Sequence, residues 1–401
     1  MAIAPNTVNT ERALALAQAA IVAASFATLL AGTNAVNPLL PVYRDLLGLD
    51  PFLLSLTFVS YVGVLVVVLL VLSRPRFTRH AAPLLLAGIA VAIISDLLLA
   101  NTQEWSILLG RAVAGIGGGM GTGSAAALVV AAIGAPGRAL AATGNLVGAV
   151  LGTTASQLVV SLLAESSPQA VTLGHAALLG ALLLAASVVL HLRRTQNRVA
   201  LGTVSTSIAT MRIDPSAVRM IATGVIGWFG VSVAIVFGAT IFADLGQPVV
   251  RAVGPALMLG ASAVAQLASP WFARVAPWMS GLVAMAVGAA GIVAGAMTGV
   301  DVLALIGFAL LGAGIGVSYR AGLVALTRSS SPARQGALSS LYAAVTYAGA
   351  AVIVLAVGWI GNMTGIVVAA LGAVAFAGVA ALVALTWAPR LRDTADDGNT
   401  A

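Results

Sequence analysis

The sequence predicts an all-α integral membrane protein with twelve transmembrane helices in two pseudo-symmetric six-helix bundles. Three observations predict this class. The 401-residue chain is 60% hydrophobic and 8% charged, with a mean hydropathy of +1.07, whereas a soluble globular protein is about 25% charged. Long apolar segments recur from one end of the chain to the other. Short motifs of the first half reappear in the second half at nearly one spacing.

The apolar segments are long enough to cross a bilayer, which requires about 20 residues in a helix. The polar N-terminus lacks the basic region of a signal peptide, so we expect the first segment to remain as a span. That segment carries Pro38 and Pro41, which we expect to bend its outer end. The twelve segments lie near residues 14–42, 52–72, 82–100, 106–133, 139–164, 170–192, 216–243, 252–272, 277–298, 301–327, 335–359 and 364–388.

The arginines predict the orientation of the chain, since all 19 basic residues are arginine. An even number of spans places both termini on one side of the membrane. Fifteen arginines fall on that side, against Arg44 and Arg251 on the other, while Arg111 and Arg320 lie inside spans. Because positive residues are retained in the cytoplasm, we expect a multi-pass protein of the cytoplasmic (inner) membrane with both termini cytoplasmic. The same rule explains the net charge of +7 without a nucleic-acid partner.

The longest connection between spans is polar and arginine-rich, and it divides the spans six and six. We therefore predict an N-terminal bundle (1–192), a cytoplasmic interdomain loop (193–215), a C-terminal bundle (216–389) and a cytoplasmic tail (390–401).

The two predicted bundles also share motifs. The Pro-Gly-Arg sequence at 136–138 is matched 196 residues later by Pro-Ala-Arg at 332–334. Phe-Thr-Arg at 77–79 is matched 195 residues later by Phe-Ala-Arg at 272–274. Parallel half-repeats of six spans are typical of rocker-type secondary transporters, in which the substrate site lies between the halves.

The stretch from Arg111 to Gly123 places a permanent charge beside a cluster of glycines inside the fourth span. An arginine in hydrocarbon costs roughly 2.5–3.5 kcal/mol on insertion scales, so it normally faces protein or water. Glycines remove side-chain bulk and let a neighbouring helix approach. A fainter copy, Gly312-Ala-Gly-Ile-Gly316, ends near the second embedded arginine, Arg320. We expect packing surfaces at these glycines and at their counterparts in the fifth span: Gly115, Gly117, Gly119, Gly144, Gly148 and Gly152.

Together these features resemble the major facilitator superfamily over essentially the whole chain. Arg111 with Gly115 and Gly117 is similar to the family's span-four motif, whose arginine is implicated in proton coupling. The resemblance implies alternating access, with spans one, four, seven and ten lining the cavity. Span five has the glycine spacing of the antiporter motif, although Thr153 replaces the proline expected after Gly152.

The loop after span two resembles the family's cytoplasmic gate, which would consist here of Arg76 and Arg79, with Arg274 as the repeat of Arg79. This match is partial. Pro75 stands where the family usually has aspartate, and Thr78 where it has glycine.

Asp96 is the one carboxylate placed well inside a span. Counted from the hairpin near Thr102, its depth differs from that of Arg111 by only ~4.5 Å, at about 1.5 Å per residue. A buried pair would reduce the cost of embedding both charges. We weigh two interpretations: a proton relay in which Asp96 protonates and releases Arg111, and a static brace between neighbouring helices.

Arg320 lies ~12 Å deeper than the cytoplasmic Arg328, by the same helical rise. Tyr319 precedes it, Tyr342 of the eleventh span falls at matching depth, and Tyr347 lies about one turn deeper. An arginine flanked by tyrosines suits an anionic or polar substrate group, with aromatic faces for a ring. The alternative is that Arg320 extends towards the lipid headgroups.

Other polar positions complete the candidate substrate site. By the family arrangement, Asn34, Asn37 and Trp228 would face the cavity. Hydrogen bonding between helices is the alternative for the amides, and packing is the alternative for the indole.

The sequence argues against several other chemistries. It has no cysteine and no lysine, which excludes thiol catalysis, Walker-type ATPase and Schiff-base chemistry. The glycine string lacks the strand and acidic residue of a dinucleotide site. His80, His175 and His191 are interpreted as lying near span ends with no paired spacing, so no metal site is predicted.

We therefore expect a transporter, not an enzyme, that needs no cofactor and acts as a monomer in the lipid bilayer. It would move a small-molecule substrate by alternating access, most simply as a proton-coupled exporter. The alternatives are an importer or uniporter of an anionic metabolite, which Arg320 would suit, and a membrane-embedded receptor or enzyme.

Overall fold

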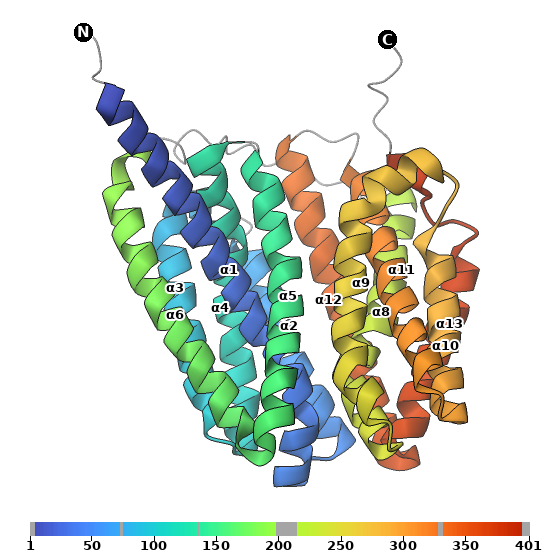
Figure 1. The fold of residues 1–401 in the computed structure, drawn as a ribbon. Coiled ribbons are helices and arrows are strands. Elements are labelled where there is room, and N and C mark those ends of the chain that lie inside the picture. Colours follow the sequence, from blue (N-terminus) through green and yellow to red (C-terminus); the bar gives the residue numbers. More distant parts are fainter. Residues whose placement is uncertain (1–4, 73–74, 135, 198–214, 328–331, 395–401) are drawn as a thin grey trace. The chain divides into compact units, whose positions relative to one another are not determined.

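The computed structural model describes residues 5–72, 75–134, 136–197, 215–327 and 332–394, and almost all of them are helical (Figure 1). This part of the chain contains twelve long helices and three short 3₁₀ helices. In chain order they are α1 (Pro5–Leu47), α2 (Pro51–Leu72), η1 (Pro75–His80), α3 (Ala81–Ala100), α4 (Glu104–Ile133), α5 (Pro136–Leu163), η2 (Ala164–Ser166), α6 (Ser167–Leu192), α8 (Pro215–Asp244), α9 (Pro248–Val275), α10 (Gly281–Thr298), α11 (Asp301–Thr327), α12 (Pro332–Thr364), α13 (Ile366–Ala384) and η3 (Leu391–Thr394).

The described residues contain eleven stretches long and apolar enough to cross a membrane, one of which, Leu146–Leu192, covers most of α5 and all of α6. The predicted class, an all-α membrane protein with twelve spanning helices, is confirmed. The first helix differs most from its expected span. It runs from Pro5 to Leu47 instead of 14–42, and it continues through both prolines.

The chain divides into two compact units, residues 1–39 with 63–207 and residues 40–62 with 208–401. Contacts within the second unit explain why the hairpin between α1 and α2 belongs to it. Arg44 pairs with Asp244 at the end of α8 at 2.9 Å, and the Asn362 side chain of α12 accepts a hydrogen bond from the backbone of Phe52. The predicted interdomain loop, 193–215, lies largely outside the described residues, and the predicted domain limits stay predictions.

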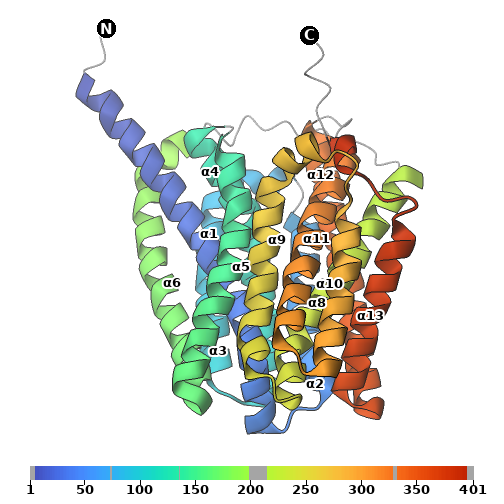
Figure 2. The same cartoon turned by 45° about the vertical axis from the view of Figure 1, so that its right-hand side comes forward.

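The halves repeat in helix order and in packing. α3 packs against α4 and α6, and α10 packs in the same way against α11 and α13 (Figure 2). Helix starts also correspond, since α5 begins at Pro136 and α12 at Pro332, 196 residues later. The α1–α2 hairpin turns at Gly48 before Pro51, and the α8–α9 hairpin turns at Gly246 before Pro248, with positive φ at both glycines. These pairs extend the sequence repeat to the ends of the helices.

The described helix ends are fixed by local signals. The Asp50 carboxylate accepts a hydrogen bond from the backbone of Leu53 and caps α2. A reciprocal capping box of Gln103 and Ser106 begins α4. These signals place the α1–α2 and α3–α4 hairpins, from which the depths of embedded residues can be counted.

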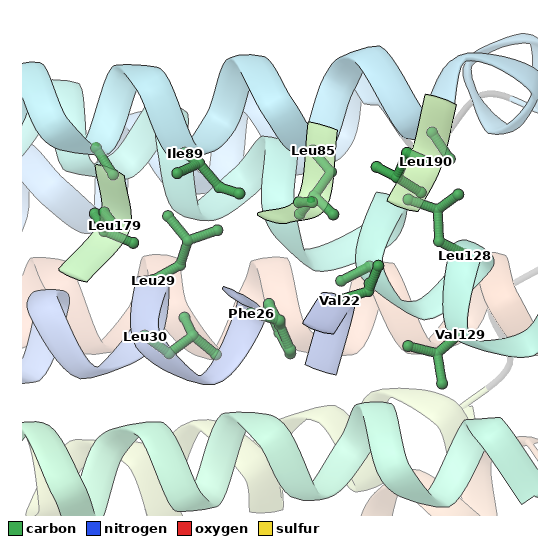
Figure 3. Packing of buried hydrophobic residues seen from close by; sticks show 14 of the residues in the cluster. Val22, Phe26, Leu29, Leu30, Leu85, Ile89, Leu128, Val129, Leu179 and Leu190 are labelled. Atoms are coloured by element: carbon green, nitrogen blue, oxygen red, sulfur yellow. The ribbon is translucent and has the colours of Figure 1, made fainter. Parts of the chain in front are cut away.

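Each unit has its own apolar core. In the first unit, side chains of α1, α3, α4 and α6 interlock around Phe26, Leu85, Leu128 and Leu179 (Figure 3). In the second unit, η3 returns to the connection between α9 and α10, where the backbone of Leu391 bonds to the carbonyl of Met279 at 3.1 Å. The Leu391 side chain packs in a buried cluster at this end.

Candidate functional site

The glycines of α4 face three different helices. A Cβ atom at Gly117 would lie 2.9 Å from the Gly88 carbonyl of α3, and one at Gly119 would lie 2.6 Å from Val68 of α2. One at Gly121 would meet Leu29 of α1 at 2.7 Å. Gly115 is also buried. The predicted packing role fits this geometry, because small residues let helix backbones come close in a membrane.

The predicted glycine stripe of α5 lies against α1. Cβ atoms at Gly148 and Gly152 would overlap the carbonyl groups of Ala27 and Ala31. Gly144, one turn earlier, faces the ring of Phe26. α5 therefore contacts α1 almost backbone to backbone along this stripe.

Arg111 is buried, and its guanidinium donates a hydrogen bond of 2.9 Å to the carbonyl oxygen of Thr33 on α1. The ion-pair partner of Asp96 in the structure is His175 on α6, whereas the depth argument pointed to Arg111. Asp96 Oδ2 lies 2.7 Å from His175 Nδ1, and both side chains are largely buried. His175 was expected near a span end, whereas it lies within α6 and pairs with Asp96.

His175 also contacts α1. Its Nε2 lies 2.8 Å from the carbonyl oxygen of Thr28. A Cβ atom at Gly32 would lie 2.7 Å from both ring nitrogens, so the ring needs a glycine at this position. The histidine therefore joins α3, α6 and α1 at one point inside the first unit.

Four aromatic residues predicted as substrate contacts lie together in the second unit. The ring centroids of Trp228 on α8 and Tyr347 on α12 are 4.8 Å apart, with an interplanar angle of 83°. Tyr319 on α11 meets Trp228 at 6.1 Å and 79°, and Tyr342 meets Tyr319 at 4.9 Å. Such edge-to-face and tilted pairs are favourable arrangements of aromatic rings.

The members of this aromatic cluster (Trp228, Tyr319, Tyr342 and Tyr347) differ in their surroundings. Tyr342 is fully buried, and its hydroxyl donates to the Tyr319 carbonyl. Cβ atoms at Gly224 and Gly322 would both meet this hydroxyl, so the ring fills a slot between two glycines. Tyr342 therefore supports Tyr319, whereas Trp228, Tyr319 and Tyr347 are partly exposed.

One polar atom of the aromatic cluster stands out among the described residues. The buried indole Nε1–H of Trp228 has no hydrogen-bond acceptor there. A buried donor left unpaired costs about 1–3 kcal/mol. The cluster thus presents aromatic rings together with one unused donor.

Arg320 is explained by a proline of the neighbouring helix. Pro270 lies inside α9 and has no N–H, so the carbonyl of Gln266 lacks its backbone donor and accepts instead from the Ser269 hydroxyl at 2.9 Å. The Arg320 guanidinium donates to that oxygen at 2.6 Å. The half-buried arginine therefore shares with Ser269 a backbone acceptor that the proline has freed.

For the remaining predicted site residues, the structure describes few contacts with other helices. The Asn34 amide donates within its own helix, to the carbonyl of Leu30 at 2.9 Å, and Asn37 is buried. Of the predicted gate residues, Arg79 and Arg274 are exposed, while the side chain of Arg76 lies outside the described residues.

The sequence reasoning missed His175, Thr28 and Gly32 in the first unit and Pro270 in the second. His175 could have been found by counting from the start of the sixth span, since it lies in the third turn of α6. No group of three metal-ligating residues occurs in the described ranges.

Comparisons with known proteins place the chain in a family. The profile of the Major Facilitator Superfamily matches residues 21–319, so the chain belongs to this superfamily of membrane transporters. The sequence-based assignment is thereby confirmed, and the protein is a transporter and not an enzyme. A comparison with curated protein sequences gave no match.

Solved structures share the fold. The chain is similar to the nucleoside transporter NupG, with a TM-score of 0.69 and 15% identity over 93% of this chain and 98% of that one. It is also similar to a D-xylose-proton symporter, with a TM-score of 0.64 and 14% identity over 94% of this chain and 98% of that one. At these identities the likeness concerns the fold.

Proposed function

We propose that this transporter moves a small, uncharged, ring-bearing organic solute across the cytoplasmic membrane by alternating access, driven by the proton gradient. We further propose that both termini are cytoplasmic, that the chain acts as a monomer and that the direction is export. Fifteen arginines on the predicted terminal side support the orientation.

The aromatic cluster is the observation that carries the proposed substrate class. Its rings offer apolar faces and edges to a planar or sugar-like ring. The unpaired indole N–H of Trp228 offers a hydrogen bond to a carbonyl or hydroxyl oxygen of the solute. Binding such a solute would satisfy a donor that is otherwise buried without an acceptor, which favours polar neutral molecules over hydrocarbons.

Arg320 favours the alternative candidate, an importer or uniporter of an anionic metabolite. Its guanidinium already has an acceptor in the Gln266 carbonyl, and this contact accounts for its position without a substrate. A carboxylate would have to compete with that backbone bond. A neutral solute at Trp228 needs no such competition, and we therefore prefer it.

Proton coupling is supported by the buried ionisable groups of the first unit. Asp96 on α3 and Arg111 on α4 are both buried in helices that we place in hydrocarbon. Ionisable residues in such segments commonly mark proton and substrate pathways. One structural neighbour is described as a proton symporter, which makes import the alternative direction.

A thermal-shift screen of the purified protein tests the proposed substrate class. Nucleosides and pentoses serve as neutral ring-bearing probes and dicarboxylates as anionic probes, each at two pH values. A ligand that binds the folded state raises the unfolding temperature. We expect stabilisation by neutral ring compounds, whereas stabilisation by the anions alone would contradict the proposal and favour the alternative.

Substitution of Trp228 by phenylalanine then tests the site. Trp228→Phe keeps a ring but removes the indole N–H, so we expect at least about tenfold weaker binding of the stabilising probe, equivalent to about 1.4 kcal/mol. Trp359→Phe on α12, where the tryptophan is exposed, is the matched control and should bind normally. Equal affinities in both variants would place the solute elsewhere.

A further inference from the structure

We propose that Asp96 and His175 together form the proton-binding site of the transporter, and that loss of one proton from the pair releases the backbone of α1 at Thr28. This inference rests on the proposed proton coupling. It adds which residues hold the proton and which contact of α1 is broken when the proton leaves. It stands on the geometry of one histidine held between two oxygen atoms on different helices.

The number of protons on the pair follows from the two oxygen atoms that the His175 ring contacts, Asp96 Oδ2 and the Thr28 carbonyl oxygen. The Thr28 oxygen is a carbonyl, which accepts only, so the facing Nε2 of His175 must carry a hydrogen. Between His175 Nδ1 and Asp96 Oδ2, at 2.7 Å, lies one further proton, on either the ring or the carboxyl group. Both arrangements give a pair with zero net charge. The pair therefore avoids the cost of an isolated charge in hydrocarbon.

Loss of one proton changes the contacts of the ring. The N–H bond at one ring nitrogen breaks, the proton passes to water, and the electron pair stays on that nitrogen. A neutral imidazole then has one N–H for two oxygen acceptors, so it can satisfy either Asp96 or Thr28 but not both. The bond to the carboxylate is the stronger one because it is charge-assisted. The contact with Thr28, and hence with α1, is the one that is lost.

Arg111 balances the charge of the deprotonated pair. Its guanidinium holds the Thr33 carbonyl, five residues beyond Thr28 on α1, which is about 7.5 Å along the helix. An arginine stays protonated at all physiological pH values and cannot itself carry the proton. With the pair protonated, the three groups sum to one positive charge, and without the proton they sum to zero. Neither state leaves an uncompensated carboxylate.

Other ionisable groups lie at the ends of the surrounding elements. Glu104 at the start of α4 and Glu165 on η2 are exposed, as are Arg79 and His80 before α3. The side chain of Arg138, the one ionisable residue of α5, lies outside the described residues. Within the described side chains around α6, His175 and Asp96 thus form the buried titratable pair.

Histidine nuclear magnetic resonance tests this inference directly, because the chain has 3 histidines. His80 and His191 are exposed, so a full-length His80→Gln/His191→Gln protein with ¹⁵N-labelled histidine reports on His175 alone. In purified protein over the range of about pH 5 to 9, we expect one transition, at which the signal of Nε2 changes because its carbonyl bond is lost. A ring that shows no transition in this range would overturn the proposal.

Two variants in the same background complete the test. Asp96→Asn should move the midpoint of the transition by about one pH unit or more, while Glu165→Gln, which alters an exposed carboxylate, should leave it in place. An unchanged midpoint in Asp96→Asn would also overturn the proposal. These measurements need no substrate, so their failure is distinguishable from a failure of the solute-binding experiments.

Discussion

At the scale of single residues, several embedded polar groups are explained by backbone atoms that need a partner. Arg320 donates, together with the Ser269 hydroxyl, to the Gln266 carbonyl that Pro270 leaves without a backbone donor. Arg111 donates to a carbonyl of α1. Sequence reasoning identified both arginines as costly in hydrocarbon. It did not identify the acceptors, because every residue has a backbone carbonyl and the sequence does not show which one on a neighbouring helix accepts the bond.

A double-mutant cycle tests the explanation of Arg320. Arg320→Gln should destabilise the protein by about 1.5–3 kcal/mol, because the Gln266 carbonyl loses a charged donor. In a Pro270→Ala background the restored N–H satisfies that carbonyl, so the same substitution should cost much less. Unfolding of the purified protein measures both costs, with Arg274→Gln on the exposed end of α9 as the control. Additive costs would show that the two residues are independent.

A second residue-scale prediction concerns the space around His175. Gly32→Ala should destabilise the first unit by about 1–3 kcal/mol, because the new Cβ would overlap the imidazole ring. Gly180→Ala on α6, where nothing lies within 4 Å of the added atom, is the control and should be close to neutral. Equal unfolding temperatures for the two variants would contradict the described contact between α1 and the ring.

At the scale of elements, the sequence predicted the helices well and their partners less well. The apolar segments agree with the observed helices, because in a bilayer every backbone group must be satisfied within its helix. The error over His175 arose from a helix start. The sixth span was expected from 170, whereas α6 begins at Ser167, which places the histidine in the third turn and next to α3.

The two halves differ in what their glycines meet at the equivalent contacts α1–α5 and α8–α12. In the first half the glycines are on α5 and meet the backbone of α1 at Ala27 and Ala31. In the second half Gly224 lies on α8 and accommodates Tyr342 of α12. The aromatic cluster therefore belongs to one half. The three tyrosines were predicted from their positions relative to Arg320, and the tryptophan from the family arrangement, and their role in binding stays a prediction.

The prediction at this scale concerns the α5 glycines that face α1, Gly144, Gly148 and Gly152: any side chain at these positions should reduce stability. Gly148→Ala should lower stability by about 1–3 kcal/mol, because the Cβ would overlap the carbonyl of Ala27. Gly123→Ala on α4 has open space and should be nearly neutral. Thermal unfolding of the purified variants measures the difference, and a Gly148→Ala protein as stable as the control would show that the helices do not touch here.

At the scale of the whole molecule, composition and repetition predicted the fold class and the superfamily. Both predictions are confirmed. The sequence was sufficient for them because they depend on properties averaged over many residues. The orientation in the membrane rests on the arginine count and stays a prediction. Direction and substrate depend on a few contacts and on free-energy differences that averaged properties do not report.

Because the chain has no cysteine, single introduced cysteines can test the orientation. Glu165→Cys lies on an outer hairpin in our assignment and Arg79→Cys on a cytoplasmic one, and both parent residues are exposed. A membrane-impermeant maleimide should label the first in intact cells and the second only after permeabilisation. The reverse pattern would invert the assigned orientation.

The most direct test of the central claim, proton-driven transport through Asp96 and His175, is solute uptake into proteoliposomes with an imposed pH gradient. The solute is the stabilising probe from the thermal-shift screen. The wild-type protein should accumulate it against its concentration gradient, and the sign of the driving pH gradient gives the direction of coupling. Asp96→Asn should still exchange solute in counterflow but should not concentrate it. Uphill accumulation by Asp96→Asn equal to that of the wild type would contradict the account.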